Sequence, residues 1–446
     1  MDHSTIRGAV LRNSLFATLN LLAISAVNLA DTYFVSKLGA AATAAGGVVF
    51  AVQAVIMAIG YTLGMGGGAH LSRSLGAGDE ATARRYATKA LLLAILIGGA
   101  VTLLGLYFSD PLLRTLGATD TVLPLARQYL RLLLFATIPI CVALVESMLL
   151  RAAGNAALAM IGFTVGGIVT VSLMPVYLFY LDLGIEGAGW AILSGYLVSA
   201  TLLFFFTLTK HSRVHLTLSL GGEERQETVT ILTTGLPSLF RHGLAALSTL
   251  LINRLAGADG DNAIAAMTVV AKITLLSLSF CTGIGQGMIP VAGYHFGARA
   301  YDKAEKAYRF ARRLSGLVML GISIPIFAFA ETWIGLFSEN AEILQIGSLA
   351  LRLQASVLFL HGTITTTTML TQLTGRTVSS TILAAARQGL FFLPILLLLS
   401  ARFGIWGIAA AQPLSDLCTY LLTLPFARNA SRPKKKEEPK KSALPS

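Results

Sequence analysis

Two acidic side chains interrupt long apolar stretches of this chain, and they are the residues best suited to chemistry. Asp31 and Glu146 both lie among Leu, Ile, Val and Ala residues. An ionisable group inside a membrane span costs about 2.5–3.5 kcal/mol on insertion scales, so it calls for either a partner or a function. A carboxyl group in a half-dry setting can load and release a proton. The sequence therefore predicts proton or cation coupling at Asp31 and Glu146.

Asp31 shares a helical face with other polar residues. It lies six residues before Lys37, which marks the end of its apolar stretch, so it sits roughly 9 Å inside that end of a helix. Asn13 and Asn20 fall on the same face, and Asn28 lies close by. We expect these three asparagines to line a polar cleft. The alternative is that Asp31 only caps its helix or pairs locally with Lys37.

Glu146 has two readings that the sequence alone leaves open. It could form a coupled site with Asp31 if the two helices face each other. It also lies five residues before Arg151, where a glutamate at the end of a span could simply snorkel or form a salt bridge.

The second half of the chain carries its own set of ionisable residues within apolar stretches. Charge balance favours a pair between Asp416 and either Arg387 or Arg241, and a role in substrate binding or coupling is the alternative. The predicted charge network of this half comprises Arg241, His242, Lys272, Arg387 and Asp416.

The composition indicates what surrounds these groups. The chain has 446 residues, of which 54% are hydrophobic and 13% charged, whereas a soluble domain is about 25% charged. Its mean hydropathy is +0.71. Apolar runs of about 20 residues can cross a bilayer. We predict an all-α integral membrane protein with transmembrane helices at 12–37, 41–75, 84–108, 121–151, 157–181, 185–209, 228–256, 263–296, 305–330, 343–372, 378–401 and 405–426.

Lys and Arg collect in alternate loops, which predicts the orientation of the chain. Basic residues gather near positions 7–12, 73–89, 151, 210–225, 299–313 and 376, while the intervening loops are mostly acidic. The positive-inside rule then places these loops and both termini in the cytoplasm. The basic tail 427–446 is expected to be disordered and to meet anionic lipid rather than nucleic acid.

The chain also contains an internal repeat with an offset near 221 residues. Gly64, Gly66 and Gly76 match Gly285, Gly287 and Gly297; Arg131 matches Arg352, and Gly154 matches Gly375. Six spans per half put both halves in the same orientation. We expect a lobe at 1–209, a connecting loop at 210–227, a second lobe at 228–426, and a central cleft between these two pseudo-symmetric six-helix lobes.

The order and duplication of short motifs make the chain similar to a known family. The motifs are NLAD at 28–31, LGAGD at 75–79, GIEGA at 184–188, GLP at 235–237, GQG at 285–287 and AQP at 411–413. Together they resemble the MATE (multidrug and toxin extrusion) transporters, in particular a bacterial branch with MepA-type and DinF-type pumps. The resemblance implies a monomeric secondary exporter of amphipathic, often cationic, organic compounds in exchange for protons or sodium ions.

The sequence departs from the family in ways that bear on the coupling ion. Many members carry Asn and Asp before a proline in the fifth span and Thr in the sixth. This chain has Thr170 and Met174 before Pro175, and Ile192 in the next span. A sodium site built on those oxygens is therefore not expected, and the proton is the favoured coupling ion. The position that the repeat pairs with Pro237 is Phe16, so a proline bend in the first helix is not expected either.

Other functions are less well supported. The chain has no Walker loop and no metal-ligand spacing, so the sequence predicts neither an enzyme, nor an ATP-driven pump, nor a protein with a bound cofactor or metal. A lipid or lipid-linked-precursor flippase of the same broader superfamily is the main alternative. A channel would not need the duplication and is the least favoured class.

Overall fold

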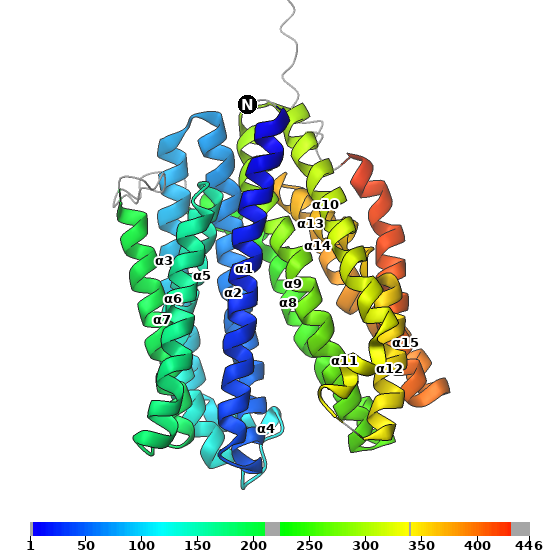
Figure 1. The fold of residues 1–446 in the computed structure, drawn as a ribbon. Helices are drawn as coiled ribbons and strands as arrows, with labels where there is room; N and C mark the ends of the chain where they lie inside the picture. Colours follow the sequence, from blue (N-terminus) through cyan, green and yellow to red (C-terminus); the bar gives the residue numbers. More distant parts are fainter. Residues whose placement is uncertain (1–2, 210–223, 339, 430–446) are drawn as a thin grey trace, which may run out of the picture.

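Every element is helical in the part of the chain that the structure describes, residues 3–209, 224–338 and 340–429. The structure is a computed structural model (Figure 1). The first lobe consists of α1 (His3–Ser36), α2 (Ala40–Ala77), α3 (Glu80–Tyr107), α4 (Ser109–Thr115), α5 (Leu123–Ala152), α6 (Ala156–Pro175), the π-helical turn η1 (Val176–Tyr180) and α7 (Ile185–Leu208).

The second lobe repeats this plan with more interruptions. It consists of α8 (Glu224–Ala256), η2 (Gly257–Asp259), α9 (Asp261–Gly297), α10 (Tyr301–Ala328), α11 (Ala330–Gly335), α12 (Ala341–Leu358), α13 (His361–Leu373), α14 (Thr377–Ala385), the π-helical turn η3 (Ala386–Leu390) and α15 (Phe392–Asn429).

Among the described residues nine helices are long and apolar enough to cross a membrane, or ten with the bent pair α12 and α13, and the layout is consistent with twelve spans, six in each lobe. In the second lobe α12 and α13 make one span with a bend of 55° between them. Residues 377–429 make two spans that separate at Gly404, where the backbone leaves the helix at φ 54° and ψ −133°. Gly184, its partner in the repeat, begins α7 with φ 54° and ψ −135°. A left-handed φ at both sites explains why both are glycine.

The structure corrects some predicted boundaries. The predicted connection 210–227 is too long, because α8 already begins at Glu224 and Glu227 is held by ion pairs to α3. The predicted tail 427–446 begins too early, since α15 continues to Asn429. The remaining residues of both segments, 210–223 and 430–446, lie outside the described part of the chain.

The loops rich in Lys and Arg lie at one end of the molecule, at the top in Figure 1, which we call the basic end. Near this end the lobes meet, with α2 packed on α8 and α1 packed on α9. Gly76 lies so close to the Tyr294 carbonyl oxygen that a Cβ atom on it would stand 1.9 Å away. Gly297 lies equally close to the carbonyl oxygen of Arg73. The two contacts are related by the repeat offset of 221, so the lobes touch through a pseudo-symmetric pair of glycines.

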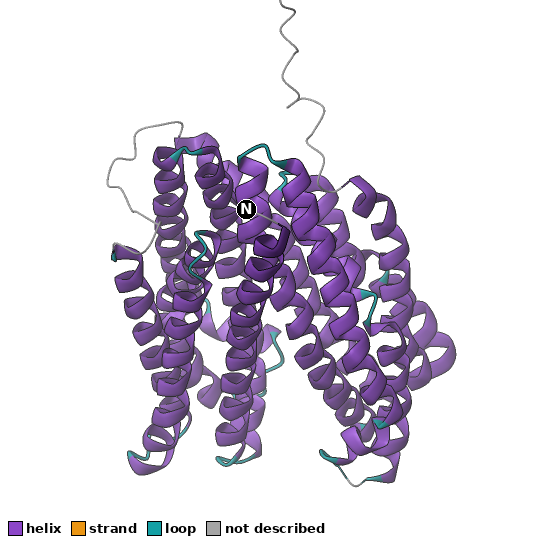
Figure 2. Cartoon of the chain, turned by 45° about the horizontal axis from the view of Figure 1, so that its top comes forward, coloured by secondary structure: helices purple, strands orange, loops and turns teal. Residues whose placement is uncertain are grey.

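Away from the basic end the lobes diverge, as Figures 1 and 2 both show. The exposure of side chains along α1 agrees with this divergence. Thr18 of α1 is buried where α1 packs on α9, but Thr32 near the far end of α1 is exposed. The fold therefore places the middle of α1, with its polar residues, at the point where two packed lobes begin to separate.

Candidate functional site

Asp31 is held by one hydrogen-bonding side chain in the first lobe. The Tyr129 hydroxyl, from α5, lies 3.0 Å from each carboxyl oxygen of Asp31 and donates to the pair. Tyr129 itself is buried, whereas Asp31 is partly exposed. No ion pair between Asp31 and Lys37 occurs, and Lys37 instead lies over the ring of Tyr33. Among the described residues, Asp31 is thus a partly exposed acid with a neutral partner, Tyr129, inside the first lobe.

Glu146 is not brought together with Asp31. Tyr129, the partner of Asp31, precedes Glu146 by 17 residues on the same helix, so the two acids are separated by roughly 25 Å along α5. Asp31 and Glu146 therefore do not form a coupled pair in this conformation, because they lie at different levels along α5. Glu146 is fully buried, and neither of its carboxyl oxygens has a hydrogen-bonding partner among the described residues. It does not pair with Arg151, which contacts Ser147 and Gln286.

The three asparagines of α1 lie in different surroundings. Asn13 and Asn20 are buried in the half of α1 nearer the basic end, and both amide atoms of Asn20 lack a hydrogen-bonding partner in the described chain. Asn28 is partly exposed and lies in the half of α1 nearer the far end. In this conformation the three asparagines therefore do not form one accessible polar lining.

A small cavity lies next to α1 inside the first lobe, between α1, α6 and α7. Its walls include Ala23, Ile24 and Val27 of α1 together with Thr170, Tyr196 and Ser199. The Thr170 hydroxyl donates to the Gly166 carbonyl oxygen and the Ser199 hydroxyl donates to that of Gly162. Both hydroxyls are already used by the backbone. Within the described residues no three His, Cys, Asp or Glu side chains group to hold a metal ion.

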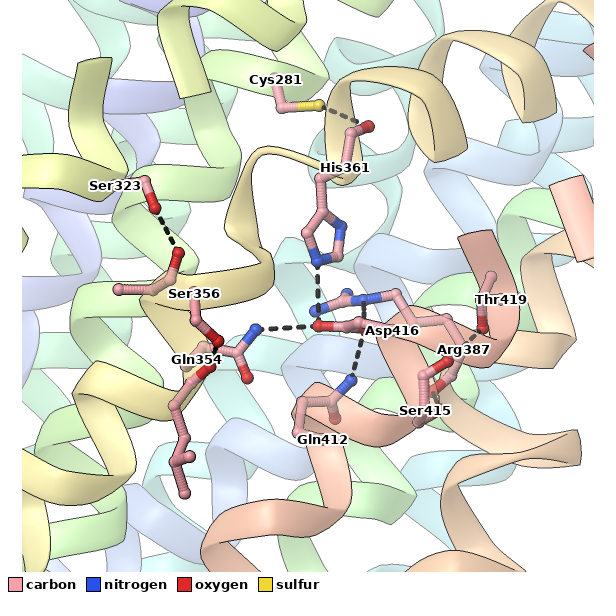
Figure 3. Close-up of polar contacts among 12 residues, drawn as sticks. Cys281, Ser323, Gln354, Ser356, His361, Arg387, Gln412, Ser415, Asp416 and Thr419 are labelled. Atoms are coloured by element: carbon pink, nitrogen blue, oxygen red, sulfur yellow. Dashed lines mark hydrogen bonds and ion pairs between the residues drawn. The ribbon is translucent and has the colours of Figure 1, made fainter. Parts of the chain in front are cut away.

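Asp416 is the fully buried acid of the second lobe, and four side chains donate to it (Figure 3). One carboxyl oxygen accepts from Arg387 Nε and Gln412 Nε2, both at 2.9 Å. The other accepts from Gln354 Nε2 at 2.8 Å and lies 3.0 Å from His361 Nε2. The ion pair with Arg387 supplies the opposite charge that a buried carboxylate needs.

This network also anchors the bend between α12 and α13. His361 is the first residue of α13, and its backbone carbonyl oxygen accepts from the Cys281 thiol at 3.1 Å (Figure 3). The Ser315 hydroxyl in turn lies 3.2 Å from that sulfur. The Asp416 network therefore joins α15, α14 with η3, and both halves of the bent span, with α9 and α10 one contact further.

The predicted charge network of the second lobe is too large. Arg241 donates a hydrogen bond to the Ser238 hydroxyl at 3.4 Å, and His242 stacks on the Tyr61 ring of the first lobe with ring centroids 4.7 Å apart. Lys272 is exposed and joins neither group. Only Arg387 and Asp416 of the five predicted residues bond to each other, because the others lie on helix faces that turn elsewhere.

Sequence reasoning missed several partners that complete these sites. Tyr129 and Gln354 carry no charge in a span and gave no signal. His361 is an ionisable residue inside the predicted span 343–372 and could have been found by the same criterion that selected Asp31.

Polar contacts also close the lobes at the basic end. Glu227 of α8 pairs with Arg85 of α3 at 3.2 Å and with Lys89. Arg151 of α5 donates to the Gln286 side chain of α9 at 2.6 Å. Any opening of the lobes at this end has to break these contacts.

Two helical lobes that pack together at one end and diverge at the other, with acids in their apolar helices, are typical of a membrane transporter. The comparisons with known proteins give the family. The MatE family model matches residues 17–176 and 237–398, one match in each lobe. The chain therefore belongs to the MatE family, which confirms the resemblance read from the motifs.

Named relatives and solved structures agree with this assignment. The chain is 26% identical over 378 residues to the multidrug export protein MepA of Staphylococcus aureus, a match that covers 83% of each chain. It is 23% identical over 377 residues to MepA of Staphylococcus saprophyticus, again with 83% of each covered.

A structure described as the outward-facing conformation of a multidrug resistance MATE family transporter has a TM-score of 0.90 and 26% identity, and covers 96% of this chain and 97% of that one. A transporter from Pyrococcus furiosus, described as having a binding pocket of reverse polarity that suggests a different function, has the same TM-score and identity and covers 96% of both chains.

Proposed function

We propose that this protein is a multidrug exporter that expels amphipathic or cationic organic compounds by antiport with a coupling cation, the proton. The observation that carries the proposal is the contrast between its two membrane-embedded aspartates. Asp416 is saturated by four donors, while Asp31 has one neutral partner and is partly exposed. Asp31 is therefore the acid that can exchange a proton with water. The named MepA relatives support export of several compounds.

The proposed cycle couples Asp31 to the substrate through alternating access. Protonation of Asp31 from outside and occupation of the cleft by substrate from inside oppose each other, so each event drives release of the other ligand. A proton that moves down roughly 100 mV provides about 2.3 kcal/mol. This free energy can sustain about a fifty-fold gradient of a neutral substrate.

The orientation follows from the same proposal. The basic end faces the cytoplasm, and the end where the lobes part faces outward. The protein then lies in the bacterial inner membrane as a monomer surrounded by lipid, with both termini inside. In this orientation the described conformation is open toward the outside. Glu227 and Gln286 belong to the contacts that keep the cytoplasmic side closed.

The test is resistance and dye uptake in cells that lack their own efflux pumps. Expression should raise the tolerated concentration of several unrelated amphipathic compounds and lower dye accumulation. A proton uncoupler should abolish both effects. If one small polar metabolite were transported and every dye and drug ignored, the proposal would be wrong. Export that continues in the presence of the uncoupler but requires sodium would show that the coupling ion is sodium and not the proton.

A further inference from the structure

One face of α9 is turned toward the first lobe along the basic half of the molecule. Gly283 packs against Thr18 of α1, and a Cβ atom on it would stand 2.1 Å from the Thr18 hydroxyl. Gly287 packs equally closely on the backbone of Ser14. Gln286, beside it, accepts the hydrogen bond from Arg151. These contacts identify the stripe of α9 that meets the other lobe.

The same stripe continues into the half where the lobes part. At 100° per residue, positions 276 and 272 lie within about 20° of the direction of position 283. Leu276 is 45% exposed, and Lys272, one turn further, is exposed as well. Lys272 lies 11 residues after the start of α9 at Asp261, so it is roughly 17 Å inside the span. Its position is on the face of α9 that is turned toward the first lobe, in the half of the molecule where the lobes diverge.

No described residue neutralises Lys272. It has no ion pair or hydrogen bond to any residue in the described ranges. The antiparallel contacts of Gly283 with Thr18 and of Gly287 with Ser14 place position 272 level with Asn28 and Leu29 of α1. Both are uncharged. The carboxyl group of Asp31, close by on α1, is bonded to Tyr129 of α5.

The neighbouring parts of both walls are apolar. Leu29 of α1 and Val55 of α2 are each 51% exposed, and Leu275 beside Lys272 is 63% exposed. Val55 lies seven residues from Thr62, on the face of α2 that packs against Gly235 of the second lobe. A single ammonium group in such a wall has the character of a specificity group: the apolar surface binds the body of a ligand, and the charge selects one functional group.

We propose that Lys272 binds an anionic group, a carboxylate, sulfonate or phosphate, on an amphipathic substrate that occupies the cleft. This inference rests on the proposed export function and narrows its substrates. A plain organic cation is disfavoured beside the ammonium group, whereas a zwitterion can place its anionic group on Lys272 and its cationic part away from it. The second lobe thus selects charge, and the first lobe couples the proton.

Two dyes that share one ring system test the proposal. Rhodamine 110 carries a carboxylate, and rhodamine 123 is its methyl ester. Full-length protein in phosphatidylcholine nanodiscs should bind rhodamine 110 more tightly in a fluorescence anisotropy titration. Lys272→Gln should weaken rhodamine 110 binding about ten- to a hundredfold, the range for a lost charged hydrogen bond. It should leave rhodamine 123 unchanged or improved. Lys272→Arg should restore rhodamine 110 binding, and Thr268→Ala on the same helix is the matched control.

Each outcome decides the question. Equal changes for both dyes, or native binding of rhodamine 110 that is no tighter than that of rhodamine 123, would overturn the proposal and leave Lys272 a role in lobe movement. Replacing part of the lipid with phosphatidylglycerol separates two sources of the anion. Competition would place a lipid headgroup at Lys272, and no competition would assign the site to soluble amphiphiles. Lys272-dependent binding without transport in liposomes would instead contradict the export function alone.

Discussion

The two lobes hold their membrane-embedded aspartates in opposite ways. Asp416 of the second lobe is fully buried and accepts from Arg387, Gln412, Gln354 and His361. Asp31 of the first lobe accepts from Tyr129 alone among the described residues, and it is partly exposed. The two acids are not partners in the repeat, because Asp31 lies on α1 and Asp416 on α15. Their different surroundings lead us to expect proton coupling only where the carboxyl group of an acid in a span is not already saturated by donors.

Breaking the Asp416 network should have the largest effect on stability. Arg387→Gln leaves the buried Asp416 carboxylate without an opposite charge, which typically costs 3–5 kcal/mol, so about that loss is expected. The thermal midpoint of purified protein in detergent should fall sharply.

Asp31→Asn serves as the comparison and should cost less than about 1 kcal/mol, because Tyr129 can still donate to the amide oxygen. The double variant Arg387→Gln, Asp416→Asn should recover part of the lost stability. Equal effects of Arg387→Gln and Asp31→Asn would contradict the distinction between the two lobes.

Substitutions of Gly76 and Gly297 at the basic end test whether the two pseudo-symmetric contacts between the lobes are equivalent. Gly76→Ala and Gly297→Ala each place a methyl group against a backbone carbonyl of the other lobe. Both should destabilise the described conformation by about 1–3 kcal/mol, the range for overpacking, and both should slow export. Gly47→Ala on α2 is the control, because a Cβ atom there meets nothing within 4 Å. Distances between spin labels across the basic end should lengthen in both variants. A change in only one of the two variants would contradict the expected equivalence of the two glycine contacts.

The ion pairs of Glu227 are expected to matter less. Glu227→Gln removes the charge that faces Arg85 and Lys89 across the lobes. Glu227 and Lys89 are buried but the Arg85 side chain is 33% exposed, so we expect a cost of about 1–2 kcal/mol, between that of surface and of buried pairs. Crosslinking between α3 and α8 should become less efficient, and the inward-open state more populated. If neither high salt nor Glu227→Gln changes the crosslinking efficiency, these ion pairs do not keep the lobes closed at the basic end.

The smallest expected effect lies at a matched turn of the two lobes. Gly78 ends α2 with φ 78°, and Arg299, its partner at offset 221, adopts φ 57° although it is not glycine. A left-handed non-glycine residue is strained by about 1 kcal/mol or more. Arg299→Gly should therefore stabilise the protein slightly, and Gly78→Ala should destabilise it by a similar amount. Thermal midpoints of the two variants that move in the same direction would refute this reading.

The sequence was sufficient for the architecture but only partly for the sites. Hydropathy, basic loops and the repeat predicted twelve spans in two lobes, since these properties are averaged over many residues. The depth and facing of single side chains could not be obtained in this way. Asp31 and Glu146 were considered as a pair although 17 residues of α5 separate Glu146 from Tyr129, the partner of Asp31. Lys272 was grouped with Asp416 although it is exposed and does not bond to that aspartate.

The uncharged partners of the two aspartates were also not predicted from the sequence. Tyr129 and Gln354 are ordinary residues of an apolar span until a neighbouring helix brings an aspartate to them. Such partnerships depend on helix packing between distant segments, which one sequence does not specify. Arg387 was among the candidates for Asp416 because a buried acid needs an opposite charge, and that requirement is visible in the sequence.

The most direct test of the account is export by Asp31→Asn protein in liposomes under an imposed pH gradient, with a dye that the native protein carries. The variant keeps the shape of the side chain and removes its proton. Tyr129→Phe, which keeps the acid and removes its partner, is run beside it. We predict that Asp31→Asn binds the dye normally and that its pH-driven export stops, while Tyr129→Phe retains export with a shifted pH dependence. Export by Asp31→Asn at the native rate would contradict the assignment of proton coupling to the first lobe.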